Sequence, residues 1–189
     1  MIGTAGHTRI VHSTIEEFER AFGKVVDPAM LRDACDEVTA LGALPRAFEQ
    51  RDFSPWNILV SRDGELAVLD WESAEPDGLP VMDLWYGLAY LAFHRDGAMG
   101  SGRYVEAYRT LLDPASVNGA ITAESLAAYL AATRVPAPSV RPLRLLTWVL
   151  HSRSEYRQLR RAARGSPTEE SLRASLFVRL WTEEMLHAS

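Results

Sequence analysis

The sequence predicts an α+β fold that is mostly α-helical and carries one small β-hairpin. Apolar residues at helical spacing, set between capping residues and stop signals, recur along most of the 189 residues. A hairpin signal occurs where two short apolar runs flank a turn that contains Asp63 and Gly64. The length favours a single domain, with two small domains as the alternative.

The helices are predicted in order along the chain. Residues 13–23 form the first, with Ser13 or Thr14 as its N-cap. The second covers 27–42, where Asp27 caps the start and Gly42 stops the helix. The remaining predicted helices cover 81–94, 102–113, 122–134, 139–165 and 166–188. The segment 81–94 is apolar nearly all round, so we expect it to be buried.

The bulk composition is that of a soluble globular protein. Hydrophobic residues make up 47% of the chain and charged residues 24%. There is no run of 18 apolar residues, so no membrane span is expected. The first residues lack a signal-peptide pattern, and the one cysteine, Cys35, cannot form an internal disulfide. These observations predict a cytoplasmic protein.

Acidic residues are concentrated in the segment 49–83. It holds nine acids and two arginines, a charge of −7, within a chain whose net charge is −5. Such a segment repels nucleic acid, so no nucleic-acid partner is expected at this surface. It also attracts cations, which makes it the first place to look for a metal site.

Three oxygen-bearing side chains are predicted to converge on the hairpin. Asn57 begins its first strand and Asp70 ends its second, so both lie at the open end of the ribbon. Asp52 precedes Asn57 by five residues, in the loop that leads into the same end. Hard oxygen ligands of this kind suit Mg²⁺, and a third carboxylate is available as a proton acceptor.

The segments "QRDFSPWN" and "VLDWE" resemble the catalytic and metal-binding loops of the aminoglycoside phosphotransferase/choline kinase family. This family has a protein-kinase-like fold. The resemblance implies that Asp52 is the catalytic base and that Asn57 and Asp70 hold Mg²⁺. It implies ATP as phosphoryl donor and a hydroxyl group of a small molecule, such as a sugar or amino sugar, as acceptor. It also implies that Asp83 in "PVMDLWY" steadies the loop by hydrogen bonds, which is a structural role.

The sequence departs from the family pattern in two places. Gln50 stands where the family has a histidine, and because glutamine still forms hydrogen bonds we expect altered loop positioning with proton transfer retained. The nucleotide-binding N-terminal lobe is expected to be absent, because the residues before Asp52 predict two helices and no five-stranded sheet. Lys24 lacks a strand context, so no residue is assigned to ATP. We therefore expect weak nucleotide binding and slow turnover unless a partner chain supplies this lobe.

Other residues near the motif are candidates for substrate binding. Trp56 precedes Asn57 and is a candidate for stacking on a substrate ring, with bracing of the loop as the alternative. Glu72 and Glu75 are candidates for binding a cationic group, with a solvated acidic loop as the alternative. Trp71 is expected to pack against the protein.

These expectations combine into one organisation. The chain is predicted to be a single kinase-like C-terminal lobe over 1–189, with leading helices in 1–45, the catalytic loop and hairpin in 46–79, and a helical substrate subdomain in 80–189. The predicted function is ATP- and Mg²⁺-dependent phosphoryl transfer. The alternative is a non-catalytic pseudokinase or binding module, or a truncated kinase lobe.

Overall fold

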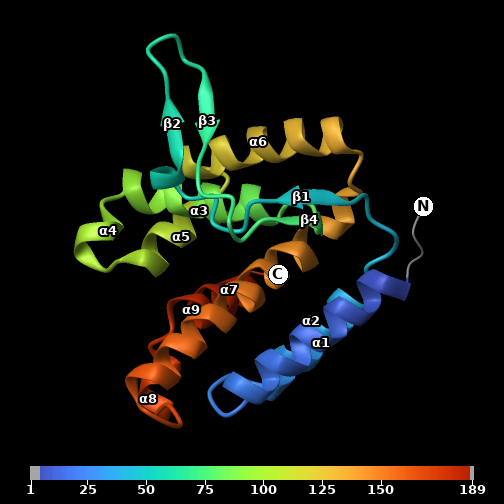
Figure 1. Cartoon of the computed structure of the whole chain (residues 1–189), viewed down its shortest axis with the longest axis vertical. Helices are drawn as coiled ribbons and strands as arrows, with labels where there is room; N and C mark the ends of the chain where they lie inside the picture. The colour runs from blue at the N-terminus through green and yellow to red at the C-terminus, as the bar shows by residue number, and fades with distance from the viewer. Residues whose placement is uncertain (1–4, 188–189) are drawn as a thin grey trace. The chain divides into compact units, whose positions relative to one another are not determined.

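The computed structural model describes residues 5–187, which form two compact units (Figure 1). The first unit contains the described residues up to Ala43 together with those from Arg141 onward, and the second unit is Leu44–Val140. The structure confirms a mostly helical chain with a small β-hairpin. Within the described residues, no helix combines the length and the apolar character needed to cross a membrane. The division at residues 45 and 79 stays a prediction.

The predicted hairpin lies in the second unit. Its strands β2 (Ile58–Val60) and β3 (Leu66–Val68) are antiparallel. Gly64 takes φ 84° in the turn, a left-handed conformation that glycine adopts without steric cost, and its N–H donates to the Ser61 carbonyl at 3.1 Å. The turn chemistry of the sequence therefore specifies this element.

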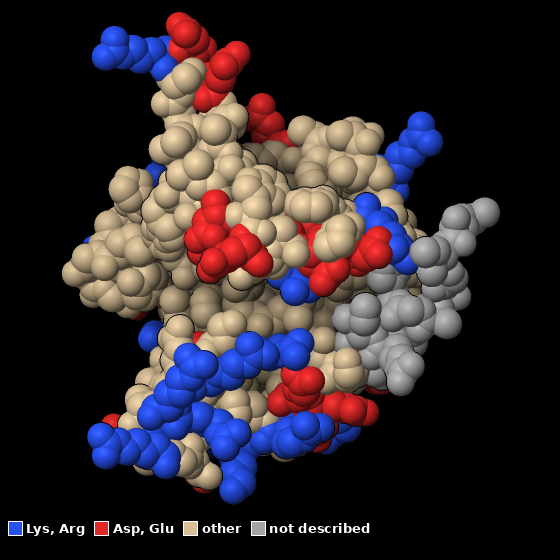
Figure 2. Space-filling view, in the orientation of Figure 1, with Lys and Arg blue, Asp and Glu red and all other residues tan. Residues whose placement is uncertain are grey.

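The hairpin projects from the helices of its unit (Figure 1). Its apolar side chains are largely in solvent: Leu59 is 54% exposed, Val60 67% and Leu66 70%. Figure 2 shows charged side chains at the tip above an uncharged stem. A two-stranded ribbon is marginally stable by itself, and these exposed side chains add little packing to it. The hairpin is therefore less well packed than the helices of its unit.

A second two-stranded sheet was not predicted. Strand β1 (Ala47–Glu49) pairs antiparallel with β4 (Glu75–Gly78), and the pairing joins the two ends of the hairpin segment. The sequence signal is weak because β4 reads Glu-Pro-Asp-Gly, four residue types that are depleted in strands. Tertiary pairing overrides that local preference. The prediction of one hairpin as the chain's only sheet is therefore wrong.

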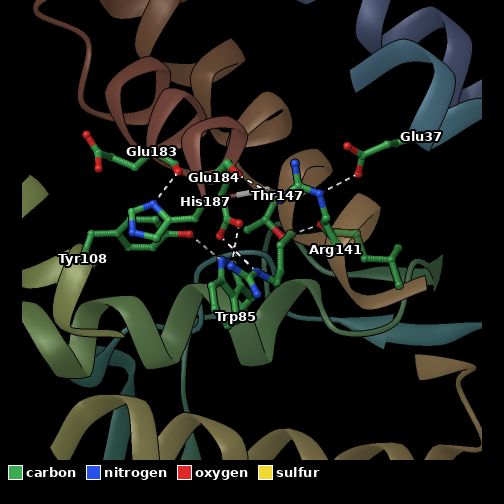
Figure 3. A network of polar contacts seen from close by, with 10 residues as sticks. Glu37, Trp85, Tyr108, Arg141, Thr147, Glu183, Glu184 and His187 are labelled. Carbon is green, nitrogen blue, oxygen red and sulfur yellow. Dashed lines mark hydrogen bonds and ion pairs between the residues drawn. The ribbon is translucent and has the colours of Figure 1, made fainter. Parts of the chain in front are cut away.

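The helices of the second unit pack in sequence, α3 on α5 and α5 on α6. Within this layer Trp85 of α3 donates its indole N–H to the Tyr108 hydroxyl of α5 at 2.9 Å, as Figure 3 shows. Both side chains are buried. The elements are α3 (Met82–Arg95), α4 (Ala98–Ser101), α5 (Tyr104–Leu112), α6 (Val117–Thr133) and the 3₁₀ turns η1 (Pro55–Asn57) and η2 (Ala137–Ser139).

Helix α6 begins earlier than predicted. Ser116, and not Thr122, is the N-cap, because the Ser116 hydroxyl accepts the N–H of Gly119 at 2.8 Å. Gly119 is required there, since a Cβ at this position would lie 1.8 Å from the Asp113 carbonyl oxygen. Glycine is generally unfavourable inside a helix, but here its lack of a side chain lets α6 lie close to the Asp113 carbonyl.

All the secondary-structure elements in the described part of the first unit are helices, and the unit has an aromatic core. Phe18 of α1 contacts Phe22 and Trp181 of α9 at ring-centroid distances of 5.3 and 5.2 Å, and Phe22 contacts Tyr156 of α7 at 5.5 Å. These rings join three helices that are distant in sequence. The elements are α1 (Ala5–Phe22), α2 (Pro28–Thr39), α7 (Val140–Ala162), α8 (Glu169–Arg173) and α9 (Leu176–Leu186).

Two ion pairs, one of them to a buried carboxylate, add to this core. The Arg144 guanidinium donates to both carboxylate oxygens of Glu184, at 3.0 and 2.5 Å, and the Glu184 side chain is fully buried. Arg141 donates to Glu37 at 2.8 Å and to the Glu184 carbonyl at 2.9 Å, so α7 is tied to α2 and α9 (Figure 3). A bidentate pair of this kind satisfies a buried carboxylate that would otherwise be costly.

Three helix boundaries in the first unit differ from the predictions. Helix α1 begins by Ala5, so Ser13 and Thr14 lie inside it and are not its N-cap. Helix α2 begins as predicted, with the Asp27 carboxylate accepting the Ala29 N–H at 2.7 Å, but ends at Thr39. The segment 166–188 is two helices, since Ser175 caps α9 anew. Residue 188 lies outside the described residues.

We predict that Gly87→Ala destabilises the protein. An added Cβ would lie 2.7 Å from the Phe53 ring and 3.0 Å from the Phe53 carbonyl oxygen, so the loop after Asp52 would have to shift. Overpacking costs about 1–3 kcal/mol, and the helix propensity of alanine returns less than about 1 kcal/mol. We expect urea unfolding to give a net loss of about 1–2 kcal/mol.

Gly100→Ala is the matched control, because no atom lies within 4 Å of a Cβ at Gly100 in α4. Its free energy of unfolding should be unchanged or slightly raised. Equal stability of the two variants would contradict the close approach of Phe53 to α3.

Candidate active site

The Asp52 loop, residues 50–57, connects β1 to β2. It turns tightly, since the Ser54 N–H donates to the Asp52 carbonyl at 2.7 Å and the Asn57 N–H to the Ser54 carbonyl at 2.9 Å. Pro55 then opens the 3₁₀ turn η1, whose last residue is Asn57. This geometry folds the loop back so that Asn57 comes to lie beside Asp52.

Asp52 is held on both carboxylate oxygens. The Asn57 amide donates to Asp52 Oδ2 and to the Asp52 carbonyl, each at 2.9 Å. The Tyr86 hydroxyl of α3 donates to Asp52 Oδ1 at 3.4 Å. Asn57 and Tyr86 are buried and Asp52 is half-buried, so the carboxylate has a defined orientation and one side open to solvent.

Gln50 links the Asp52 loop to the end of the hairpin. Its side-chain amide donates to the carbonyls of Leu69 and Asp70, at 2.9 and 2.7 Å, and its side-chain oxygen accepts the Asp52 N–H at 2.8 Å. Gln50 is 2% exposed and uses both ends of the carboxamide. One side chain therefore sets the distance between the backbone of Asp52 and the backbone of Asp70.

Asp83 anchors the start of the same loop. Its two carboxylate oxygens accept the N–H groups of Gln50 and Arg51, at 2.5 and 2.9 Å. Asp83 lies in the first turn of α3, where a helix dipole favours a negative charge. The loop is thus fixed to α3 through Asp83 and Tyr86.

Asp70 completes the group. Its neighbour Leu69 donates its N–H to the Asn57 carbonyl at 2.8 Å, which continues the β2–β3 ladder up to the site. Asp70 is close enough to Asp52 for its negative charge to raise the Asp52 pKa. The structure therefore brings Asp52, Asn57 and Asp70 to one end of the hairpin.

The site contains strained backbone. Arg51, Asp70 and Val81 take φ values of 71°, 55° and 73°, and Val81 is a β-branched residue for which this region is unfavourable. Arg51 directly precedes Asp52, and Val81 is the N-cap of α3, the helix that carries Asp83. Strain of this kind persists where the surrounding structure over-determines it and is common at functional sites.

The pKa of Asp52 lies above its usual value. Burial is the main cause, hydrogen bonds from Asn57 and Tyr86 oppose it, and the charge of Asp70 adds to it. Burial also raises the pKa of Asp83, against the hydrogen bonds from Gln50 and Arg51. A carboxylate with a raised pKa is a stronger proton acceptor than a free one.

The donor set fits a hard divalent cation. The Asn57 amide nitrogen is used on Asp52, which leaves the Asn57 side-chain oxygen as a potential ligand, and Asp70 offers an exposed carboxylate. Mutual repulsion of Asp52 and Asp70 would be relieved by a cation. In the described part of the chain no group of three or more His, Cys, Asp and Glu side chains is arranged to hold a metal. Such an ion would therefore depend on Asn57 and on non-protein oxygens.

The other sequence candidates lie around this centre. Glu75, in β4, is 3.7 Å from the Arg51 guanidinium, whereas Glu72 is exposed. Trp71 is 48% exposed and contacts Phe48, so it packs only in part. Lys24 is an exposed turn residue of the first unit, outside the unit that holds Asp52.

Sequence reasoning missed Tyr86. It lies within an apolar helix where its hydroxyl gives no pattern of its own, and only the fold shows that it contacts Asp52. The left-handed residues Arg51 and Val81 were missed for a similar reason, since neither is a glycine or an asparagine.

We predict that Asp83→Ala destabilises the Asp52 loop. The substitution leaves the N–H groups of Gln50 and Arg51 without their acceptor. Gln50 is buried, and an unsatisfied buried donor costs about 1–3 kcal/mol, whereas the exposed Arg51 N–H can bond to water. Urea unfolding should show a loss of about 1–3 kcal/mol. The matched control is Glu124→Ala at an exposed position of α6 in the same unit, which should change stability by less than about 0.5 kcal/mol. Similar losses in both variants would contradict the anchoring role of Asp83.

We predict that Asp52→Asn gains stability relative to the natural protein as the pH rises. Because the folded-state pKa of Asp52 is raised above its ordinary value of 3.8, the folded state binds more protons than the unfolded state just above that pH. The stabilising contribution of Asp52 is complete below about 3.8 and is lost as the pH rises through the folded-state pKa.

The measurement is the difference in unfolding free energy between Asp52→Asn and the natural protein, in metal-free buffer from pH 4 to 8. That difference should increase with pH. A difference that is constant, or that decreases, would contradict the burial of an ionised Asp52.

A comparison with known protein families finds a match that includes the residues of this site. A model of the phosphotransferase enzyme family matches residues 14–120, a range that includes Asp52, Asn57, Asp70 and Asp83. Searches of curated proteins and of solved structures find no match. The matched range covers more than half of the chain and contains the whole hydrogen-bonded group around Asp52. The chain belongs to the phosphotransferase enzyme family.

Proposed function

We propose that this chain is the kinase-like C-terminal lobe of a phosphotransferase that moves the γ-phosphoryl group of ATP to a hydroxyl of a small molecule, with Mg²⁺ as cofactor. The observation that carries the proposal is the linkage of Asp52 to Asn57 and, through Gln50, to the backbone of Asp70. Phosphoryl transfer depends mainly on positioning and on charge stabilisation. The network supports the positioning, and the proposed Mg²⁺ would supply the charge stabilisation.

Asp52 is the proposed catalytic base. It would accept the proton of the acceptor hydroxyl as that oxygen bonds to the γ-phosphorus and the bond from phosphorus to ADP breaks. Asn57 and Tyr86 hold the carboxylate in one orientation, and the raised pKa makes it a better proton acceptor. Asp83 and Gln50 act as positioning residues, because they hold the loop and do not carry the proton.

Asn57 and Asp70 are the proposed ligands of Mg²⁺. The ion, when bound, would neutralise negative charge on the phosphates of ATP. Both residues offer oxygen atoms, and both lie at the end of the hairpin next to the base. Glu72 remains a candidate for a cationic group of the acceptor, while Glu75 is already near Arg51.

We also propose that the hairpin is covered by a lobe that supplies the nucleotide contacts. Within residues 5–187 the sheets have two strands each, so the described chain contains no five-stranded lobe. Three of the hairpin's six strand residues, Leu59, Val60 and Leu66, are apolar and more than half exposed. The source that we propose is a partner chain or a further segment of a longer chain.

The second candidate is a non-catalytic binding module of the same family. It is favoured by the small extent of the sheets, because nucleotide affinity in this reaction depends on a phosphate-covering lobe. In that case the hairpin and its apolar stem would be the functional surface.

We predict a Mg²⁺-dependent rise in melting temperature with millimolar ATP that Asp70→Ala abolishes. Ligand binding stabilises the folded state in proportion to the logarithm of ligand concentration. Asp63→Ala, an exposed carboxylate at the hairpin turn, is the control and should keep the rise. Where ATP turnover is measurable, Asp52→Asn should lower it by a factor of about 10²–10⁴.

No rise at any nucleotide concentration, with or without Mg²⁺, would favour the binding module. A rise that persists in Asp70→Ala would show that ATP binds elsewhere and would remove the proposed metal site.

A further inference from the structure

A row of aromatic side chains leads away from Asp52. The Tyr86 ring, whose hydroxyl is on Asp52, lies 4.5 Å from the Tyr90 ring between centroids. Trp56 meets Tyr90 edge to face, at 5.1 Å and 90°. Tyr90 also contacts Phe93, which contacts Tyr104, at centroid distances of 5.3 and 5.2 Å.

Trp56 differs from its aromatic neighbours in its exposure. It is 54% exposed, whereas Tyr86 is 5% and Phe93 is fully buried. A tryptophan that only braced a loop would bury most of its ring, because that burial is the source of its stabilising effect. Here a large part of the indole remains in solvent, four residues after Asp52 and directly before Asn57.

The indole is also held in place. Pro55 restricts the backbone before it, Asn57 after it is tied to Asp52, and Tyr90 contacts its ring. A ring fixed in this way binds another ring at little cost in side-chain entropy. The apolar surface and the carboxylate that would receive a proton are therefore parts of one rigid loop.

We propose that Trp56 and Tyr90 form the ring-binding wall of the acceptor site, and that the acceptor is an alcohol that carries an aromatic ring. This inference rests on the proposed function for the role of the hydroxyl, but not for the binding of the ring. The ring packs against Trp56 and the hydroxyl reaches the open side of Asp52.

The chemistry of the wall favours an aromatic ring over a polyol. Aromatic pairs gain stabilisation beyond the burial of their area, with ring centroids 4.5–7 Å apart. A polyol would have to exchange water for protein hydrogen bonds at each buried hydroxyl. Each ring of the wall carries one polar group at its edge, the Trp56 indole N–H and the Tyr90 hydroxyl, whereas the ring faces are apolar.

The test is ligand-observed saturation-transfer NMR with the full chain, without nucleotide. The probes are benzyl alcohol, cyclohexylmethanol and myo-inositol. The first two differ in the aromaticity of the ring and share the hydroxymethyl group. We expect benzyl alcohol to bind more tightly than either of the others.

The variants are Trp56→Ala, Trp56→Phe and, as a control, Trp71→Ala. Trp71 has a similar exposure, 48%, in the same unit, but contacts Phe48 and not Tyr90. Trp56→Ala should weaken benzyl alcohol binding about fivefold or more, and Trp56→Phe should retain most of it. Trp71→Ala should bind as the natural protein does, and circular dichroism confirms that each variant is folded.

Binding of benzyl alcohol that is unchanged in Trp56→Ala, or that is no tighter than binding of cyclohexylmethanol, overturns the inference. So does preferential binding of myo-inositol. Because the readout contains no ATP, these outcomes are independent of phosphoryl transfer. If ring binding depends on Trp56 but ATP gives no rise in melting temperature, the ring-binding wall is supported and the proposed function is rejected.

Discussion

The hydrogen bonds of the Gln50 carboxamide are the constraint on which the rest of the site depends. One end of this side chain accepts the Asp52 N–H, and the other donates to the carbonyls of Leu69 and Asp70. Leu69 and Asp70, nineteen and twenty residues further along the chain, are thereby held to the same buried side chain as Asp52. A family histidine at this position has two ring nitrogens, while glutamine has a carbonyl and two N–H groups. In this chain Gln50 stands in place of that histidine, and both ends of its carboxamide form hydrogen bonds.

This arrangement lowers the local stability of the segments that form the site. Asp52 and Asp83 are carboxylates with raised pKa values, and Arg51, Asp70 and Val81 have left-handed backbone conformations. Each of these features is unfavourable by itself, and they lie within the segments that form the site. The aromatic and helical packing of α3 against α5 offsets them. Unfavourable local features supported by a packed scaffold are typical of a site that is kept for its chemistry.

The sequence predicts those parts of the fold that local chemistry determines. The Asp-Gly turn specifies the hairpin, Asp27 specifies the start of α2, and the spacing from Asp52 to Asn57 to Asp70 predicts their meeting. Contacts between distant segments were not predictable. The strand β4 forms from a Glu-Pro-Asp-Gly segment because β1 pairs with it, and Tyr86 reaches Asp52 because α3 packs beneath the loop. Likewise Gly119 permits α6 to start at Val117, since only the tertiary structure shows the carbonyl that a side chain would strike.

The projecting hairpin has a consequence for control of the site. Asp70 lies two residues after its second strand, while the strands themselves have little packing on either face. The Gln50 amide fixes the Asp70 carbonyl, so a surface that covered the apolar stem would bury apolar area beside Asp70 without displacing its backbone. Such a cover would exclude water from this end of the hairpin. The electrostatic interactions of the Asp70 carboxylate would then act in a lower dielectric and become stronger.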